Sequence, residues 1–303
     1  MRTPEFWQHS GGTSTLLTPA GFIYAMAGRL LRRRHTPWRS PIPVICIGNV
    51  VVGGAGKTLL ALSIGARLRE RGHNIHFLTR GYGGSLKGPV RVNNDYHGAE
   101  EVGDEPLLLA DVAPTWVSRN RAASAKAAID EGADVLIMDD GLQNLTLAKN
   151  ISILAIDGGY GFGNEKIIPA GPLREPIADA LKRVDKIVIV GEDRLRVKEK
   201  LPTNKTILNA TLVVPTEVAS NFNGRRVVAF AGIARPAKFF QTLKELNCEV
   251  VMTFEFADHH IYSPDKIMKI VEEANKLNAT PVTTSKDAAR LPPPARLMVE
   301  VLP

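Results

Sequence analysis

A glycine-rich loop that could bind phosphate lies near the start of the chain, at residues 48–58 (GNVVVGGAGKT). It follows an apolar run of strand length and leads into a segment with helical periodicity. Backbone N–H groups of such a loop, with the helix N-terminus behind it, bind phosphate oxygens. A lysine here reaches the β- and γ-phosphates, and the next hydroxyl binds Mg²⁺. The expected nucleotide-binding residues are Gly53, Gly54, Ala55, Gly56, Lys57 and Thr58.

The loop departs from the common pattern G-x-x-x-x-G-K-[ST], because Val51 stands where that pattern has its first glycine. The strand–loop–helix context still favours a nucleotide site over a glycine-rich turn without a ligand. Partitioning ATPases with a Gly-Gly-x-Gly-Lys-Thr loop usually carry a lysine before the glycine pair, where this chain has Val52. The Asn-Lys pair at 204–205 lacks the aspartate of a guanine-reading motif. These two observations argue against a partitioning switch and a GTPase.

A pair of aspartates ends a second apolar run, at residues 135–141 (VLIMDDG). In a phosphate-loop protein, an aspartate at the end of a strand helps to hold Mg²⁺. We expect Asp139 to be a metal-binding residue together with Thr58, and Asp140 to share the site. The loop and the aspartates together predict a nucleoside triphosphate and Mg²⁺ but do not identify the reaction.

Apolar runs of strand length alternate with helix-periodic segments along residues 41–205. The alternation predicts a parallel sheet with helices on both faces, as in the α/β/α sandwich of P-loop NTPases. A second alternating set over residues 206–303 predicts a smaller α/β domain with linker strands. Expected strands are 44–47, 75–78, 90–92, 116–117, 135–138, 151–156, 186–190, 227–231, 249–254, 282–284 and 297–301. Expected helices are 58–71, 105–112, 121–131, 177–184, 236–246 and 264–277.

The basic charge of the chain is concentrated in its N-terminal arm. Residues 1–40 contain six arginines and one acidic residue, and so carry most of the net charge of +7. The nearly neutral remainder argues against a nucleic-acid groove. The arm also holds an uncharged stretch at 11–28 followed by a run of arginines. We expect a helix that lies on a membrane surface with its arginines at anionic headgroups. A helix packed on the protein body, a signal peptide and a true span are the alternatives.

Several further blocks resemble one known family, the tetraacyldisaccharide 4′-kinases (lipid A 4′-kinases). Besides the phosphate loop, they are RGYGG at 80–84, GDEP at 103–106, DDGLQ at 139–143, PAGPLREP at 169–176, FADHH at 256–260 and TTSKD at 283–287. The resemblance covers most of the chain, and its specificity comes from the order and spacing of the blocks.

The resemblance implies a kinase that uses ATP and Mg²⁺ to phosphorylate the 4′-hydroxyl of tetraacyldisaccharide 1-phosphate, which gives lipid IVA in lipid A biosynthesis. It also implies two α/β/α units joined by a short β linker. The family works at the cytoplasmic face of the bacterial inner membrane. We expect a peripheral or monotopic monomer that binds the glycolipid and the membrane surface.

The resemblance also assigns roles to residues. It implies that Asp104 is the catalytic base and that His259 partners it, with Lys57 as the third catalytic residue. Asp104 as a helix cap and 258–260 as a polar loop are the plain alternatives. Further candidates are Glu105 and Glu175 for the nucleotide or Mg²⁺, and Arg80, Tyr82, Arg121 and Gln143 for the substrates.

Two rival functions remain open at the level of sequence. One is a P-loop kinase of a small metabolite, which would not need the N-terminal arm. The other is a membrane-associated P-loop ATPase switch, which would not need Asp104 and His259.

Overall fold

The computed structural model describes residues 4–9 and 11–302. Its larger domain is built on an eight-stranded sheet in the order β3-β4-β2-β5-β1-β6-β7-β8. Every neighbouring pair is parallel except β3 with β4. The strands are β1 (Val44–Gly48), β2 (Ile75–Thr79), β3 (Val90–Arg91), β4 (Thr115–Val117), β5 (Val135–Asp139), β6 (Ile151–Asp157), β7 (Lys186–Val190) and β8 (Thr206–Ala210).

Helices cover both faces of this sheet, because its central strands are apolar on both sides. Alternate residues of β1, β2 and β5 pack against α2 and α4 on one face. The intervening residues pack against α5 on the other face. The helical segments of this part are α2 (Lys57–Glu70), α3 (Ala99–Val102), α4 (Asp104–Ala110), α5 (Arg121–Asp130), α6 (Ile177–Leu181) and the 3₁₀ segments η1 (Glu5–Trp7) and η2 (Val197–Lys200). The sandwich architecture is confirmed.

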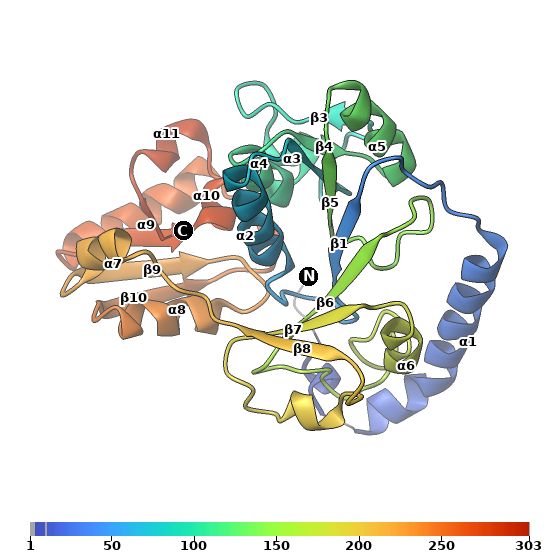
Figure 1. The fold of residues 1–303 in the computed structure, drawn as a ribbon. Helices are drawn as coiled ribbons and strands as arrows, with labels where there is room; N and C mark the ends of the chain where they lie inside the picture. The colour runs from blue at the N-terminus through green and yellow to red at the C-terminus, as the bar shows by residue number, and fades with distance from the viewer. Residues whose placement is uncertain (1–3, 10, 303) are drawn as a thin grey trace.

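The smaller domain has a parallel four-stranded sheet in the order β10-β9-β11-β12. Helices α7 and α8 pack on one face, and α9 and α11 pack on the other. The elements are α7 (Thr216–Phe222), β9 (Arg226–Ala231), α8 (Pro236–Glu245), β10 (Glu249–Glu255), α9 (Pro264–Lys276), β11 (Thr280–Thr284), α10 (Ser285–Ala288), α11 (Pro293–Arg296) and β12 (Glu300–Leu302). In Figure 1 this domain lies to the left, in orange and red.

The division between the domains differs from the expected boundary at residue 206. Strand β8 hydrogen-bonds to β7 along its whole length, from Thr206 to Ala210, and so completes the larger sheet. The smaller domain then begins with α7, after a short extended segment. The sequence did not reveal β8, because residues 206–210 (TILNA) are partly polar and show no clear strand pattern.

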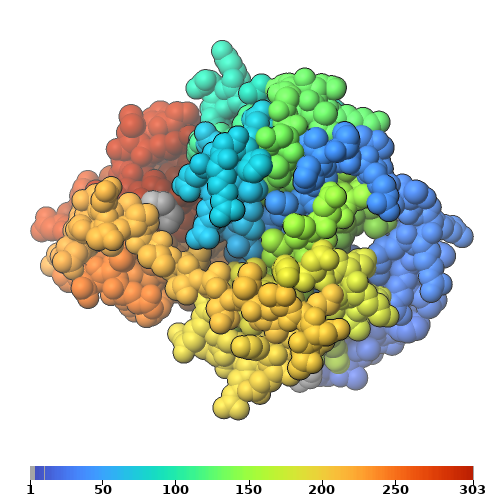
Figure 2. Space-filling view, viewed as in Figure 1, coloured from blue at the N-terminus to red at the C-terminus, as the bar shows by residue number. Residues whose placement is uncertain are grey.

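The N-terminal arm forms one long helix, α1 (Gly12–Arg34), at the outer edge of the larger domain (Figure 1). It contacts the body through a narrow stripe of small residues, in which Ser14, Gly21 and Ala25 are buried, and through ion pairs of Arg29 and Arg32 with the α6 region. A Cβ atom on Gly21 would lie 2.8 Å from the carbonyl oxygen of Ile167, so the helix and that loop touch backbone to backbone. No described helix is long and apolar enough to cross a membrane. The space-filling view shows α1 and the smaller domain on opposite sides of the molecule (Figure 2).

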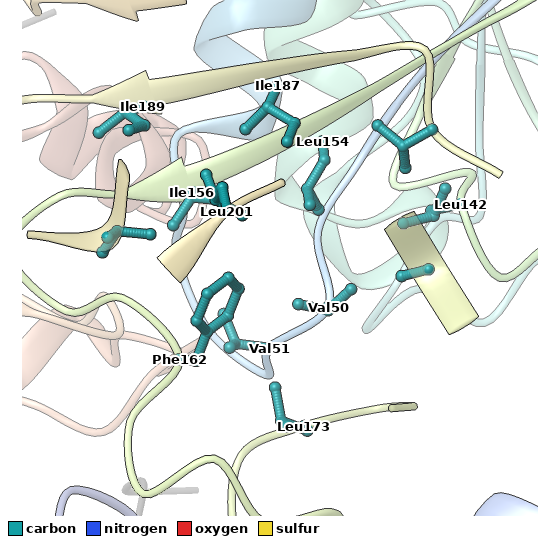
Figure 3. Close-up of a cluster of buried hydrophobic side chains, with 13 residues drawn as sticks. Val50, Val51, Leu142, Leu154, Ile156, Phe162, Leu173, Ile187, Ile189 and Leu201 are labelled. Atoms are coloured by element: carbon teal, nitrogen blue, oxygen red, sulfur yellow. The ribbon is translucent and has the colours of Figure 1, made fainter. Parts of the chain in front are cut away.

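A hydrophobic cluster beneath the phosphate loop explains the residue that departs from the common pattern. Val50 and Val51 pack with Phe162 and Leu173 below the strands β6 and β7 (Figure 3). Val51 also forms an isolated antiparallel bridge with Leu173, and its φ is negative. The backbone at this position therefore does not need glycine, and the side chain anchors the start of the loop to the core.

Candidate active site

The phosphate loop joins β1 to α2 at the carboxyl edge of the larger sheet, where open α/β sheets bind ligands. Gly53 and Gly56 have φ values of 118° and 74°, which glycine adopts at little cost. Gly56 precedes the first turn of α2, and Lys57 and Thr58 in that turn are buried. The helix N-terminus thus points its free N–H groups toward the loop, as a phosphate site requires.

Thr58 and Asp139 meet at the centre of this edge. The Thr58 hydroxyl donates to Oδ2 of Asp139 at 2.9 Å. Oδ1 of Asp139 is buried and has no hydrogen-bond partner. Burial, reinforced by the negative charge of Glu105, raises the pKa of Asp139 to about 7. An unsatisfied carboxylate oxygen beside a threonine hydroxyl fits a divalent cation such as Mg²⁺, which takes one or two protein ligands beside substrate phosphates.

Asp140 has partners that set it apart from Asp139. Both of its oxygens accept from Nη1 of Arg174 at 2.9 Å, and Oδ1 lies 3.7 Å from Nζ of Lys57. Burial opposes ionisation of Asp140, but the positive charges of Lys57 and Arg174 outweigh it and lower its pKa to about 2. In the structure Asp140 therefore pairs with Lys57 and Arg174, and its share in a metal site stays a prediction.

Asp104 and His259 come together across the two domains. Asp104 opens α4 in the larger domain, and His259 lies in the loop after β10 in the smaller one. Nδ1 of His259 is 3.2 Å from Oδ2 of Asp104. Burial opposes ionisation of Asp104, yet pairing with His259 and the charges of Lys286 and Arg290 lower its pKa. The same pairing raises the pKa of His259. The expected pair thus exists as a charged contact.

Two cations of the smaller domain, Lys286 and Arg290, contact the acidic residues at the start of α4. Lys286 donates to Glu105 at 2.5 Å, and its pKa is raised because Glu105 and Asp104 outweigh burial. Nε of Arg290 lies 3.6 Å from Asp104, while its Nη2 donates to Asp287 at 2.7 Å. The sequence gives no signal for Arg290, because nothing nearby marks it as different from a surface arginine.

A cleft of about 760 Å³ opens beside this pair. Tyr82, Asp104 and His259 line it, and the rings of Tyr82 and His259 lie 5.2 Å apart. A separate hollow of about 240 Å³ is lined by Arg80, Tyr82 and Arg119. The structure therefore brings Tyr82 to the Asp104–His259 pair and leaves Arg80 exposed at an adjacent hollow.

Glu175 is a buried carboxylate held by side chains from several parts of the chain. It is 1% exposed and accepts from Arg183 at 2.7 and 2.9 Å and from Gln143 at 3.0 Å. Arg32 of α1 is 3.4 Å away. The carboxylate is thus held by Arg183, Gln143 and Arg32, and its contact with the nucleotide or Mg²⁺ stays a prediction.

Gln143 and Arg121 also have structural partners. Gln143 donates to the carbonyl of Asn49 at 2.9 Å, just before the phosphate loop, and so braces that loop. Arg121 is 2% exposed and donates to the carbonyl of Ser118. Burial lowers the pKa of Arg121 to about 10. The structure shows this guanidinium held at the sheet edge, and its role toward a substrate stays a prediction.

A family model described as tetraacyldisaccharide-1-P 4′-kinase (LpxK) matches residues 13–302. The chain belongs to this family.

Relatives and a solved structure agree with this assignment. The tetraacyldisaccharide 4′-kinase of Rhodospirillum centenum is 48% identical over 308 residues, which cover 100% of this chain and 91% of that protein. The one from Rhodospirillum rubrum is 50% identical over 306 residues, with 100% and 92% covered. A crystal structure of LpxK from Aquifex aeolicus in complex with ATP matches with a TM-score of 0.74 and 24% identity, covering 96% of this chain and 92% of that one. This last likeness shows the shared fold.

Proposed function

We propose that the protein is a kinase that transfers the γ-phosphate of ATP to the 4′-hydroxyl of tetraacyldisaccharide 1-phosphate and so forms lipid IVA. Family membership supports this reaction. The observation that carries it is the contact between Asp104 and His259 beside the cleft, which is the geometry that a base and its partner would need. A hydrolytic ATPase switch has no use for such a pair between domains.

The chemistry follows from what the site holds. The hydroxyl oxygen forms a bond to the γ-phosphorus, the bond to the bridging oxygen of ADP breaks, and the hydroxyl proton passes to Asp104. Asp104 is ionised at neutral pH because its pKa is lowered, so it can accept the proton. The positive charge of His259 keeps this carboxylate oriented. Lys57 and the loop N–H groups neutralise the phosphates.

Mg²⁺, when bound, would add positive charge at the β- and γ-phosphates. Thr58 and the free oxygen of Asp139 would hold it. Lys286 donates to Glu105 and neutralises its charge, which limits the repulsion between Glu105 and the carboxylate of Asp139.

Helix α1 supports a location at a membrane surface, which we place at the cytoplasmic face of the inner membrane. Large apolar side chains that are 48–80% exposed project from it: Leu16, Phe22, Ile23, Tyr24, Met26, Leu30 and Leu31. Contiguous apolar surface of this kind marks an interaction site. The exposed Arg33 and Arg34 of the last turn follow directly and would meet anionic headgroups. We propose a monomer, because both members of the catalytic pair come from one chain.

The test is an assay of the purified full chain with ATP, Mg²⁺ and tetraacyldisaccharide 1-phosphate in detergent. We expect a 4′-phosphorylated product by mass spectrometry. Asp104→Asn should lower kcat by roughly 10²- to 10⁴-fold and leave the Kd for ATP unchanged within about threefold. Asp130→Asn, at an exposed position at the end of α5, is the matched control. Absence of product from the wild-type chain would refute the assignment, and normal turnover of Asp104→Asn would refute the base.

A further inference from the structure

A second set of contacts joins the two domains, and the chemistry described above does not use it. Arg235 precedes α8 in the smaller domain. Its Nη2 donates to the carbonyl of Gly54 in the phosphate loop and to Oδ2 of Asp157 at the end of β6. Lys238, one turn further, donates to the same oxygen of Asp157 at 3.1 Å. Three segments that are far apart in sequence thus meet over the loop.

The position of Arg235 matters because of what the phosphate loop lacks. Residues 48–58 contain a single cation, Lys57, and Val52 stands where partitioning ATPases carry a second lysine. The guanidinium of Arg235 contacts Gly54, which belongs to the part of the loop whose N–H groups cradle phosphates. The smaller domain therefore delivers a positive charge to the place where the negative charge of the nucleotide would be greatest.

Asp157 holds this charge in place without cancelling it. Its side chain is 7% exposed, and two cations share it, so one positive charge remains uncompensated at the loop. Arg235 is 32% exposed and so remains accessible to a ligand bound at the phosphate loop. Burial opposes ionisation of Asp157, but Arg235 and Lys238 lower its pKa, which keeps the trio charged.

The segment that follows β9 and carries Arg235 also contacts the backbone of His259. The backbone N–H of His259 donates to the carbonyl of Gly232 at 3.0 Å, and Nη2 of Arg290 donates to that carbonyl as well. Gly232 stands three residues before Arg235, at the end of β9. The short segment 232–235 thus contacts both the backbone of His259 and the phosphate loop.

We propose that Arg235 is a catalytic residue that contacts the β- and γ-phosphates of ATP, supplied by the smaller domain to the phosphate loop when the domains close. The inference rests on the proposed phosphoryl transfer. In the reacting complex Arg235 exchanges the Gly54 carbonyl for phosphate oxygens and keeps Asp157 as its anchor. Cations that act in this way, in the same chain or in a partner, raise kcat by about 10³- to 10⁵-fold.

Nucleotide binding tests the proposal without the lipid. Calorimetry on the full chain with Mg²⁺ measures the Kd for the non-hydrolysable ATP analogue AMP-PNP and for AMP. We expect Arg235→Ala to weaken analogue binding by about tenfold and to leave AMP binding within about twofold. Lys238→Ala is the matched variant, because it removes the other cation on Asp157 but no contact with the loop. It should change both affinities by less than about threefold.

Turnover provides the second readout. Arg235→Ala should lower kcat at least 100-fold, and Arg235→Lys should recover part of the loss because it keeps the charge but not the two-pronged geometry. Arg226→Ala, at an exposed ion pair of the same domain, should behave as wild type. The proposal is overturned if Arg235→Ala binds the analogue as tightly as the wild type does. It is also overturned if Arg235→Ala and Lys238→Ala lose the same amount of activity, because both residues would then act only as contacts between the domains. If the wild-type chain phosphorylates no lipid but Arg235→Ala still loses analogue affinity, the phosphate contact stands and the proposed acceptor fails.

Discussion

Val51→Gly would restore the common phosphate-loop pattern, and we expect it to harm the protein. Val51 is 6% exposed and packs in the cluster beneath the loop. Loss of its two methyl groups removes about 1.6 kcal/mol of apolar burial, and the remaining cavity brings the cost of Val51→Ala to about 2 kcal/mol. Glycine adds roughly 0.5–1 kcal/mol of backbone entropy, so Val51→Gly should cost about 3 kcal/mol. That corresponds to about 6–12 °C in Tm for a domain of this size.

Urea unfolding and calorimetry on both variants measure these losses, with ATP titration on the folded proteins. The order of stability should be wild type, then Val51→Ala, then Val51→Gly, with the Kd for ATP unchanged within about threefold. Val213→Ala, at a side chain that is 79% exposed, is the control and should cost less than about 0.5 kcal/mol. If Val51→Gly were as stable as wild type and bound ATP tenfold more tightly, the anchoring role of Val51 would be refuted.

Three further predictions concern the catalytic pair, Glu175 and the arm. The stabilisation linked to the raised pKa of His259 is fully present below pH 6.5 and is lost as pH rises through that raised pKa. The stabilisation linked to the lowered pKa of Asp104 is fully present above the ordinary pKa of 3.8 and is lost as pH falls through the lowered pKa. We therefore expect the pH profile of kcat to show an alkaline limb above pH 6.5 in the wild type and no such limb in His259→Gln. An alkaline limb that persists in this variant would contradict the assignment of His259. Glu175→Gln should cost about 2–3 kcal/mol in urea unfolding, because Arg183 and Arg32 lose their buried partner, and should leave the KM for ATP unchanged. The exposed Glu192→Gln is its control, and a large rise in the KM for ATP would restore the nucleotide role. Phe22→Ser with Ile23→Ser should lower binding to anionic phosphatidylglycerol vesicles at least tenfold in a sedimentation assay, whereas equal binding would exclude this face as the docking surface.

The phosphate loop and Asp139 could be predicted from the sequence because their geometry is local. A strand, a glycine loop and a helix are consecutive, so the order of residues fixes which N–H groups face the ligand. Asp139 ends the strand next to β1, where parallel strands bring their carboxyl ends together. The positions of Lys57, Thr58 and Asp139 in the structure agree with this reasoning.

Glu175, Arg121 and Asp140 could not be assigned in the same way. Each is a charged residue within or beside a recognisable block, and the block does not say whether the side chain meets a ligand or another side chain. Arg183 and Arg32 neutralise Glu175, and Arg174 and Lys57 occupy Asp140. Such partners come from elements whose relative placement depends on packing.

The sequence by itself determined the fold class, the phosphate loop and the concentration of basic charge in the arm, since all three depend on local order and periodicity. The tertiary structure alone decided that β8 belongs to the larger sheet. It also brought Arg235 to the phosphate loop. The physical reason is that contacts between residues far apart in the chain are set by how two apolar cores pack and how the domains close, which neither spacing nor composition records.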